Sequence, residues 1–381
     1  MVAYAPQLPN AYDENLIPLD VRQEYFKETL LLSPLTLFMG STPLSIVQVR
    51  NLNDGSGVST DFAFSKNINY KNPIKGYAQL TGKGQLMEFY TDRVVVEQQA
   101  LLDTLYGVEL TKLSTPIAVF ERMKPLLQEA HNQELVYSIL KSATFDSYPL
   151  AAAGTAPTTG PQVNRYVYGN GRVQASVDAG VDAMVTAGPG TAAAPGDGLS
   201  VRHIRKLRNM AIYGGAVFEQ EKRITPYKME LAEGFASPYY VYFMDTASYE
   251  SLQSDPEWAI YNGRGFKEMA NQPTALSGAF FKGQIDNVLV YEVPELGGFQ
   301  VTSSTNARVA SWNLFCGAEA FGLVWAREPW FTQEWTNHRT VVEQAIIEIR
   351  GQKALKFPSF NPALNKIPVE NGIIHSFVKL V

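Results

Sequence analysis

The sequence is poor in the residues that carry most enzyme chemistry. Among its 381 residues are one cysteine, Cys316, and four histidines, His131, His203, His338 and His375. A single cysteine excludes an intramolecular disulfide and a cysteine-ligated zinc site. The histidines show no H-x-x-x-H spacing, so a transition-metal site is not expected. The sequence therefore predicts no metal centre.

Long apolar runs, targeting signals and an excess of positive charge are also missing. No apolar run approaches the roughly 20 residues that span a bilayer. The N-terminal MVAYAPQLPN lacks the basic and apolar regions of a signal peptide. We therefore expect a soluble protein made in a cytoplasm, with no membrane partner. The net charge of −5 has the wrong sign for a protein that grips nucleic acid. Any DNA partner would be enclosed or adjacent.

Motifs for nucleotide chemistry and for a serine nucleophile are absent. The chain has no G-x-x-x-x-G-K-[ST] phosphate loop and no G-x-S-x-G turn. GNGR at 169–172 and GRG at 263–265 begin like dinucleotide-binding turns but lack the third glycine. We predict no cofactor-binding residues and no catalytic residues.

What the sequence does contain is packing material, in segments of differing character. Hydrophobic residues make up 45% and charged residues 18%, enough for one large or two medium domains. The first forty-odd residues differ, because five prolines interrupt all but one helical run, DVRQEYFKETLLL, with Asp20 as its N-cap. This segment indicates an extended arm that needs another surface to lie on.

Residues 44–91 are typical of a β-ribbon. LSIVQVRNL, VSTDFAFS and QLMEFYT alternate like strands, and NDGSG and GKG are turn sequences. Such a ribbon buries too little apolar surface to be stable alone. We expect it to lean on its own body or on a neighbouring subunit.

From Arg93 to about Thr144 the pattern indicates helix. Ser114-Thr115-Pro116 is a start signal, and apolar residues then recur every three or four positions. Pro125 should kink this helix or split it. Residues 149–198, rich in Ala, Gly, Pro and Thr, indicate an insertion of loops and small strands around NRYVYGNGRVQASV.

The remaining segments predict an α+β body. LSVRHIRKLRNMAIY, at 199–213, shows an apolar stripe with basic residues facing elsewhere. YYVYFMDTASYESL passes from strand to helix at Asp245, and Ser254 in SDPEW starts a capping box. We expect a helix in WNLFCGAEAFGLVW, and late strands in TVVEQAIIEIRGQKALKF and IIHSFVKLV.

Four features could be chemical or structural. In GQIDNVLVYEVPEL, at 283–296, Asp286 and Glu295 flank an apolar strand, a position suited to catalytic acids or to the solvated edges of a wall. Asp245 fits a helix cap better than a catalytic acid. Cys316 among aromatic residues fits a buried apolar residue better than a nucleophile. The basic stripe of 202–208 fits a solvated or paired face better than a nucleic-acid contact. We favour the structural interpretation of all four.

In this order, the segments quoted above resemble the major capsid proteins of tailed bacteriophages, which have the Hong Kong 97-like fold, and are most similar to the branch found in short-tailed phages. PYYVYFMDTASYESLQSDPEW, ALSGAFFKGQIDNVLVYEVPEL and TVVEQAIIEIRGQKALKFPSF carry this resemblance. It implies the following regions: 1–43 N-terminal arm, 44–91 extended loop, 92–148 and 341–381 peripheral domain with a spine helix, 149–198 insertion, and 199–340 axial domain.

The resemblance implies a structural protein without catalysis. Copies would form hexamers and pentamers of an icosahedral head enclosing double-stranded DNA, without sequence-specific binding, in a virion made in the host bacterial cytoplasm. Portal, scaffolding and decoration proteins would be further partners. Some relatives crosslink a loop lysine, and Lys66, Lys71, Lys75 and Lys83 lie in the matching region. An encapsulin-type compartment, which packages protein cargo, and a soluble α+β enzyme are the alternatives.

Overall fold

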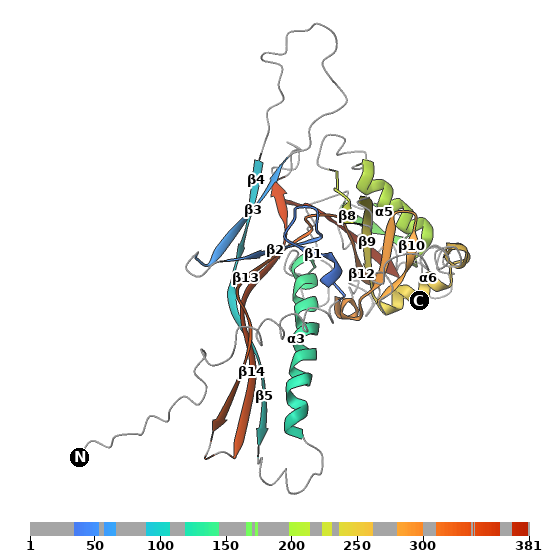
Figure 1. The fold of residues 1–381 in the computed structure, drawn as a ribbon. Helices are drawn as coiled ribbons and strands as arrows, with labels where there is room; N and C mark the ends of the chain where they lie inside the picture. Colours follow the sequence, from blue (N-terminus) through green and yellow to red (C-terminus); the bar gives the residue numbers. More distant parts are fainter. Residues whose placement is uncertain are drawn as a thin grey trace, which may run out of the picture.

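Two β-sheets and a long helix organise the chain (Figure 1). A five-stranded sheet is drawn out into a long blade with helix α3, Val119–Ala143, along it. An eight-stranded sheet forms a rounder body with helices α5 and α6. The computed structural model describes residues 34–52, 57–65, 89–106, 119–144, 165–169, 172–173, 198–213, 223–230, 236–261, 280–299, 310–336, 338, 340–358 and 368–379.

The blade is built on a long antiparallel hairpin. β13, Phe321–Thr336, pairs with β14, Val341–Ala354, and β14 pairs in turn with β5, Glu97–Tyr106. β2, Val47–Asn51, joins parallel to β13, and β1, Met39–Gly40, forms the other edge. The late strand in TVVEQAIIEIRGQKALKF is confirmed as β14.

Two predicted boundaries in this region are wrong. Residues 47–51, expected in the ribbon, belong to the blade. The expected helix from Arg93 is instead strand up to residue 106. Both segments take their conformation from pairing with a distant strand, and tertiary pairing of this kind overrides local pattern.

The ribbon itself is confirmed as two antiparallel strands. β3, Ser59–Ser65, pairs with β4, Phe89–Val95, and β4 leads directly into β5. The predicted strand QLMEFYT contributes its last residues to β4. The four candidate crosslinking lysines and the helix expected after Asp20 lie outside the described residues.

α3 confirms the predicted long helix. Its 25 residues run through Pro125 without a break, so the helix is not split there. Pro125 is exposed, and no residue of the sheet needs its place. The start signal Ser114-Thr115-Pro116 lies outside the described residues. Leu127, Leu135 and Ile139 are buried on the side of the helix that faces the body and blade.

The eight-stranded sheet has the order β10-β11-β9-β12-β17-β6-β7, with β8 paired to β9. β12 is buried at all seven positions, and β11 at four of five, which confirms the wall strand within 283–296. The strand predicted in IIHSFVKLV is β17. The strands span β6 Tyr166–Tyr168, β7 Arg172–Val173, β8 Tyr227–Glu230, β9 Ala236–Met244, β10 Phe281–Ile285, β11 Val288–Glu292, β12 Ala310–Cys316 and β17 Ile373–Lys379.

The helix expected in WNLFCGAEAFGLVW is wrong. Residues 310–316 are β12 and residues 321–336 are β13, joined by a turn that contains Gly317. A Cβ on Gly317 would lie 2.5 Å from the carbonyl oxygen of Thr225, so the close approach requires glycine. A continuous buried apolar run fits a helix or a fully buried strand equally well.

The insertion at 149–198 contributes to the core of the larger sheet. β6 runs parallel to β17, and Tyr166, Val167 and Tyr168 are buried. Tyr168 stacks on Phe377 with ring centroids 5.2 Å apart. The strand expected in NRYVYGNGRVQASV is therefore confirmed, while most of the insertion lies outside the described residues.

The helices of the body follow their predicted faces. α5, Val201–Tyr213, buries Val201, Ile204 and Leu207, as its apolar stripe predicts. α6, Thr246–Gln253, begins after Asp245. The predicted cap at Ser254 is wrong, because Ser254 ends α6 and Asp255 caps the next helix, accepting a hydrogen bond from the Glu257 amide at 2.9 Å.

The two sheets divide the chain differently from the expected domain bounds. β13, placed at 321–336 in the expected axial region, belongs to the blade. β17, placed at 373–379 in the expected peripheral region, lies in the eight-stranded sheet. The chain crosses between the sheets after β12 and again before β17. A short pair, β15 Lys356–Pro358 with β16 Pro368–Glu370, lies on the return path.

Candidate functional site

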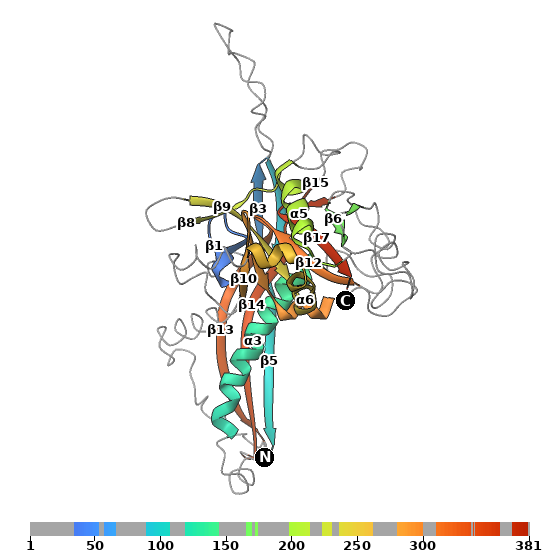
Figure 2. The same ribbon diagram turned by 90° about the vertical axis from the view of Figure 1, so that its right-hand side faces the viewer.

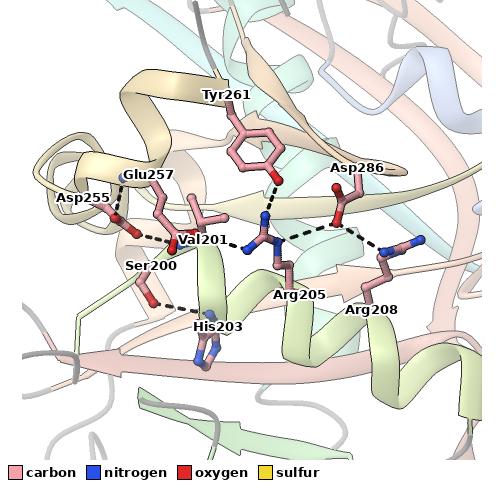
Figure 3. A network of polar contacts seen from close by, with 9 residues as sticks. All are labelled: Ser200, Val201, His203, Arg205, Arg208, Asp255, Glu257, Tyr261 and Asp286. Carbon is pink, nitrogen blue, oxygen red and sulfur yellow. Dashed lines mark hydrogen bonds and ion pairs between the residues drawn. The ribbon is translucent and has the colours of Figure 1, made fainter. Parts of the chain in front are cut away.

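The acid at the start of the wall strand is a structural ion-pair partner. Asp286 lies in the β10–β11 turn with a φ of 50°, in the left-handed region that Asp tolerates. Its Oδ2 accepts a hydrogen bond from Arg208 at 3.2 Å and lies 3.7 Å from Arg205 Nε (Figure 3). The carboxylate thus fixes α5 against the edge of the sheet.

The basic face of α5 is largely paired within the chain. Arg205 also donates to Glu257 at 3.2 Å and to the hydroxyl of Tyr261 (Figure 3). The Tyr261 hydrogen bond raises the pKa of the Arg205 guanidinium. Asp255 accepts from the Val201 amide at 2.8 Å, at the start of α5. The network ties α5 to the following helix and to the β10–β11 turn, which supports the paired interpretation of this stripe.

Glu295, the second flanking acid, lies in the short 3-10 helix η5, Pro294–Phe299. Partial burial raises the pKa of its carboxyl group. Among the residues that the structure describes, no group of three or more His, Cys, Asp or Glu side chains could hold a metal ion. The described structure brings neither flanking acid into a constellation for acid–base catalysis.

Asp245 is the cap of α6. Its Oδ1 accepts from the Ser248 amide at 2.9 Å, and its own amide donates to Asn313 Oδ1 at 3.1 Å. Asn313 in turn donates to Ser248 Oγ at 2.8 Å. The carboxylate is 1% exposed and occupied with local hydrogen bonds, so the structural interpretation is confirmed.

Cys316 is fully buried in β12. Burial raises the pKa of its thiol well above the ordinary value, which disfavours the thiolate that a nucleophile requires. The cysteine therefore packs as a small apolar residue, as predicted.

Sequence reasoning missed a buried polar chain beside this cysteine. Trp312 Nε1 donates to His375 Nδ1 at 2.9 Å, and His375 Nε2 contacts Glu370. Because indole nitrogen only donates, Nδ1 must accept, and the proton of a neutral ring lies on Nε2. All three side chains are fully buried. No nucleophile or solvent path accompanies them in the described structure, so the chain orders the core.

A second buried cluster joins α3 to the blade. Arg350 is wholly buried and pairs with Glu348, whose carboxylate lies 2.9 Å from the guanidinium, and with Glu134 of α3. Arg350 also donates to Ser138 at 2.9 Å, and His131 Nε2 lies 2.9 Å from Glu348. The widely separated sequence positions gave no signal of this cluster, which fixes the helix over β14.

The ribbon is anchored to the blade at its base. Phe62, Phe64 and Val94 pack with Val324 and Leu355. Its polar anchors are Asp92 with Lys353, Asp92 with the Lys356 amide at 2.9 Å, and Arg50 over the Phe62 ring at 4.6 Å. The base of the ribbon thus leans on its own body, one of the two options that the sequence left open.

These observations describe a protein organised by packing and ion pairs, and the comparisons with known proteins place it. The family model described as "Phage capsid protein" matches residues 14–378. The chain belongs to the phage capsid protein family. A comparison with curated protein sequences found no match.

Solved capsid structures share the fold. The capsid of Ralstonia phage GP4 is similar at a TM-score of 0.67 with 18% identity, covering 100% of this chain and 98% of the other. The cyanophage Pam1 capsid gives 0.60 with 16% identity, covering 100% and 99%. The capsid of Helicobacter pylori bacteriophage KHP30 gives 0.59 with 14% identity, covering 91% and 90%. These likenesses support an α+β capsid fold.

The family assignment decides between the functional classes that the sequence left open. This protein is a phage capsid protein that forms the shell of the head, a structural component of the virion and not an enzyme. None of the described helices combines the length and the apolar character needed to cross a membrane. The clusters described above accordingly hold the protomer together.

Proposed function

We propose that this capsid protein assembles as hexamers and pentamers into an icosahedral head that encloses double-stranded DNA. The observation that carries the proposal is the family match over residues 14–378, nearly the whole chain. The blade supports it, because one of its faces carries exposed apolar residues that suit contacts with further copies.

The regions of the fold then take roles in the shell. The five-stranded sheet with α3 would be the peripheral domain, and α3 its spine helix. The eight-stranded sheet with α5 and α6 would be the axial domain, which includes β6 of the 149–198 insertion. Residues 1–43 would be the arm, and the ribbon of β3 and β4 the base of the extended loop, each gaining burial on adjacent copies.

The further partners follow from the chemistry of a container. A net charge of −5 suits a shell that encloses DNA without gripping it, because a strongly cationic lining would hold the DNA tightly. We expect no sequence-specific DNA contact. Portal, scaffolding and decoration proteins would complete the particle.

Negative-stain electron microscopy of the purified chain tests the assembly. Closed shells or hexameric rings are the expected result, and a small soluble oligomer on a sizing column would contradict the proposal. Particles from phage-infected cells, treated with nuclease, should retain double-stranded DNA. Retention of a protein cargo in its place would favour an encapsulin-type compartment.

A loop deletion tests the role of the ribbon. Deleting residues 50–85 would also remove β3, whose Phe62 and Phe64 are buried, so the cleaner variant replaces residues 66–88 with a two-residue Asn-Gly turn. The expected product is a folded protein that assembles poorly. Shells of normal yield from this variant would show that the loop is dispensable.

A further inference from the structure

One face of the blade is bare in a single copy. α3 lies along the other face, where its Leu127 packs on Ile346 with Leu101 and Phe331 (Figures 1 and 2). Neighbouring residues of a strand point to opposite faces of a sheet. Leu102, next to Leu101, therefore points away from α3, and its side chain is 65% exposed.

The strand register shows how far this bare face extends. Leu102 lies opposite Ala345 of β14, which lies opposite Thr332 of β13. The adjacent row on the same face is apolar across three strands and consists of Ala100, Ile347 and Trp330. At the far end of β5 is Tyr106, which is 73% exposed.

β5 is also the edge strand of the sheet, and it lacks the usual protection. Its sequence, EQQALLDTLY, contains no proline, lysine or arginine. Soluble monomers block exposed edges with such residues because a long flat edge invites pairing with another chain. An unprotected edge beside an exposed apolar face is therefore typical of a surface that another molecule covers.

The same face carries two opposed carboxylates. Glu334 of β13 lies directly opposite Glu343 of β14, and Thr104 completes the row. Like charges in this position repel. Within the described part of the chain, neither carboxylate has an ion-pair partner.

The basic residue on this face is too distant to compensate. The Arg327 guanidinium lies over the ring of Trp330 at 3.9 Å, and Arg327 is aligned with Ile349. Ile349 lies six residues along β14 from Glu343, roughly 20 Å at the rise of a strand. The two carboxylates therefore call for a cation from outside the protomer.

We propose that this face of the blade is a contact between copies of the chain in the shell. The second copy places a lysine or arginine against Glu334 and Glu343, and apolar side chains against Leu102. The inference rests on the proposed function, and the occupant is a second copy because copies of a capsid protein surround one another in the shell. Charge complementarity specifies what that copy brings.

The apolar half of the contact is tested by Leu102→Lys. We expect the fraction of chain in shells, measured by sedimentation and negative stain, to fall at least about tenfold, with the melting temperature of the protomer unchanged. The matched control is Ile260→Lys, at a residue 58% exposed beside the other sheet, which should assemble. Normal shells from Leu102→Lys would overturn the proposal while leaving the proposed function intact, whereas failure of the wild-type chain to assemble would overturn the function itself.

Hydroxyl-radical footprinting of the wild-type chain gives a readout that no substitution can disturb. Leu102 and Tyr106 should react several-fold more slowly in shells than in unassembled protein. The solvent-exposed Tyr213 of α5, 71% exposed, is an internal reference outside the proposed contact. Equal reactivity of Leu102 and Tyr106 in the two states would overturn the proposal, whatever the variants do.

The charged half is tested by the double variant Glu334→Gln, Glu343→Gln. If a second copy supplies a cation, this variant should form weaker shells, whose dissociation depends less on salt than that of the wild type. Glu250→Gln, at an exposed acid of α6, is the control. Repulsion alone would predict the reverse, so shells as stable as the wild type or more stable would overturn the trans ion pair.

Discussion

The two sheets differ in how completely a single copy covers them. In the eight-stranded sheet, all seven residues of β12 are buried, as are six of the seven in β17. In the blade, β5 has no buried residue along its ten positions. Burial of apolar surface is the main favourable term in folding. The first sheet is therefore stabilised by its own chain, whereas part of the second depends on what assembles around it.

Polar groups follow the same division. The eight-stranded sheet encloses the chain of Trp312, His375 and Glu370 within a continuous aromatic core. In the blade, α3 is fixed by one charged cluster around Arg350, next to a small apolar cluster around Leu127. Substitutions in the two regions should consequently have different effects on folding and on assembly.

Truncating the central aromatic residue of the larger sheet should have the greatest effect. Trp312→Ala removes a fully buried ring that packs on Phe377 at 5.1 Å and a hydrogen bond to His375. We expect a loss of about 3–5 kcal/mol in the free energy of unfolding, measured by urea denaturation. Trp335→Ala in the blade, at a residue 39% exposed, is the control. Equal losses would contradict the contrast between the sheets.

Breaking the charged cluster of the blade should rank second. Arg350→Ala leaves Glu348 buried without its cation, and such a change costs about 3 kcal/mol. Hydrogen exchange should show faster opening of α3 while the core of the eight-stranded sheet stays protected. Arg93→Ala, at an exposed ion pair with Asp61, should leave both readouts unchanged. Uniform loss of protection across the two sheets would show that they unfold as one unit.

The ranking depends on features that the sequence revealed to different degrees. The wall strand, the ribbon and α5 were predictable because their apolar residues repeat at the period of their element. Asp245 was predictable because a cap acts on residues next to it in sequence. Local patterns of this kind survive without knowledge of the tertiary structure.

The missed features all depend on residues far apart in the chain. β5 is a strand because β14 pairs with it, and β12 is a strand because β9 and β17 flank it. The Arg350 cluster combines residues of α3 and β14 more than two hundred positions apart. The opposed pair of Glu334 and Glu343 becomes visible only through the strand register. No local period encodes such contacts.

Acid should weaken the larger sheet selectively. Burial of His203 against that sheet lowers its pKa from 6.5 to about 4, and its Nε2 lies 2.7 Å from Ser376 Oγ. The unfolded chain therefore binds a proton that the folded chain refuses between these values. Stability is full above about pH 6.5 and falls towards pH 4, by roughly 2–3 kcal/mol. His203→Gln should flatten this part of the stability–pH curve, and an unchanged slope would exclude His203 as its source.

The smallest effect is expected where a single helix meets the larger sheet. Asp245→Ala removes the side-chain acceptor for the Ser248 amide, and loss of an N-cap costs about 1 kcal/mol. Asp245→Asn keeps an acceptor oxygen at the same position and should retain most of the stability. Urea denaturation of the two variants measures the difference. If Asn were as harmful as Ala, the negative charge and not the cap would be what α6 requires, and the eight-stranded sheet would depend on electrostatics at this point as the blade does at Arg350.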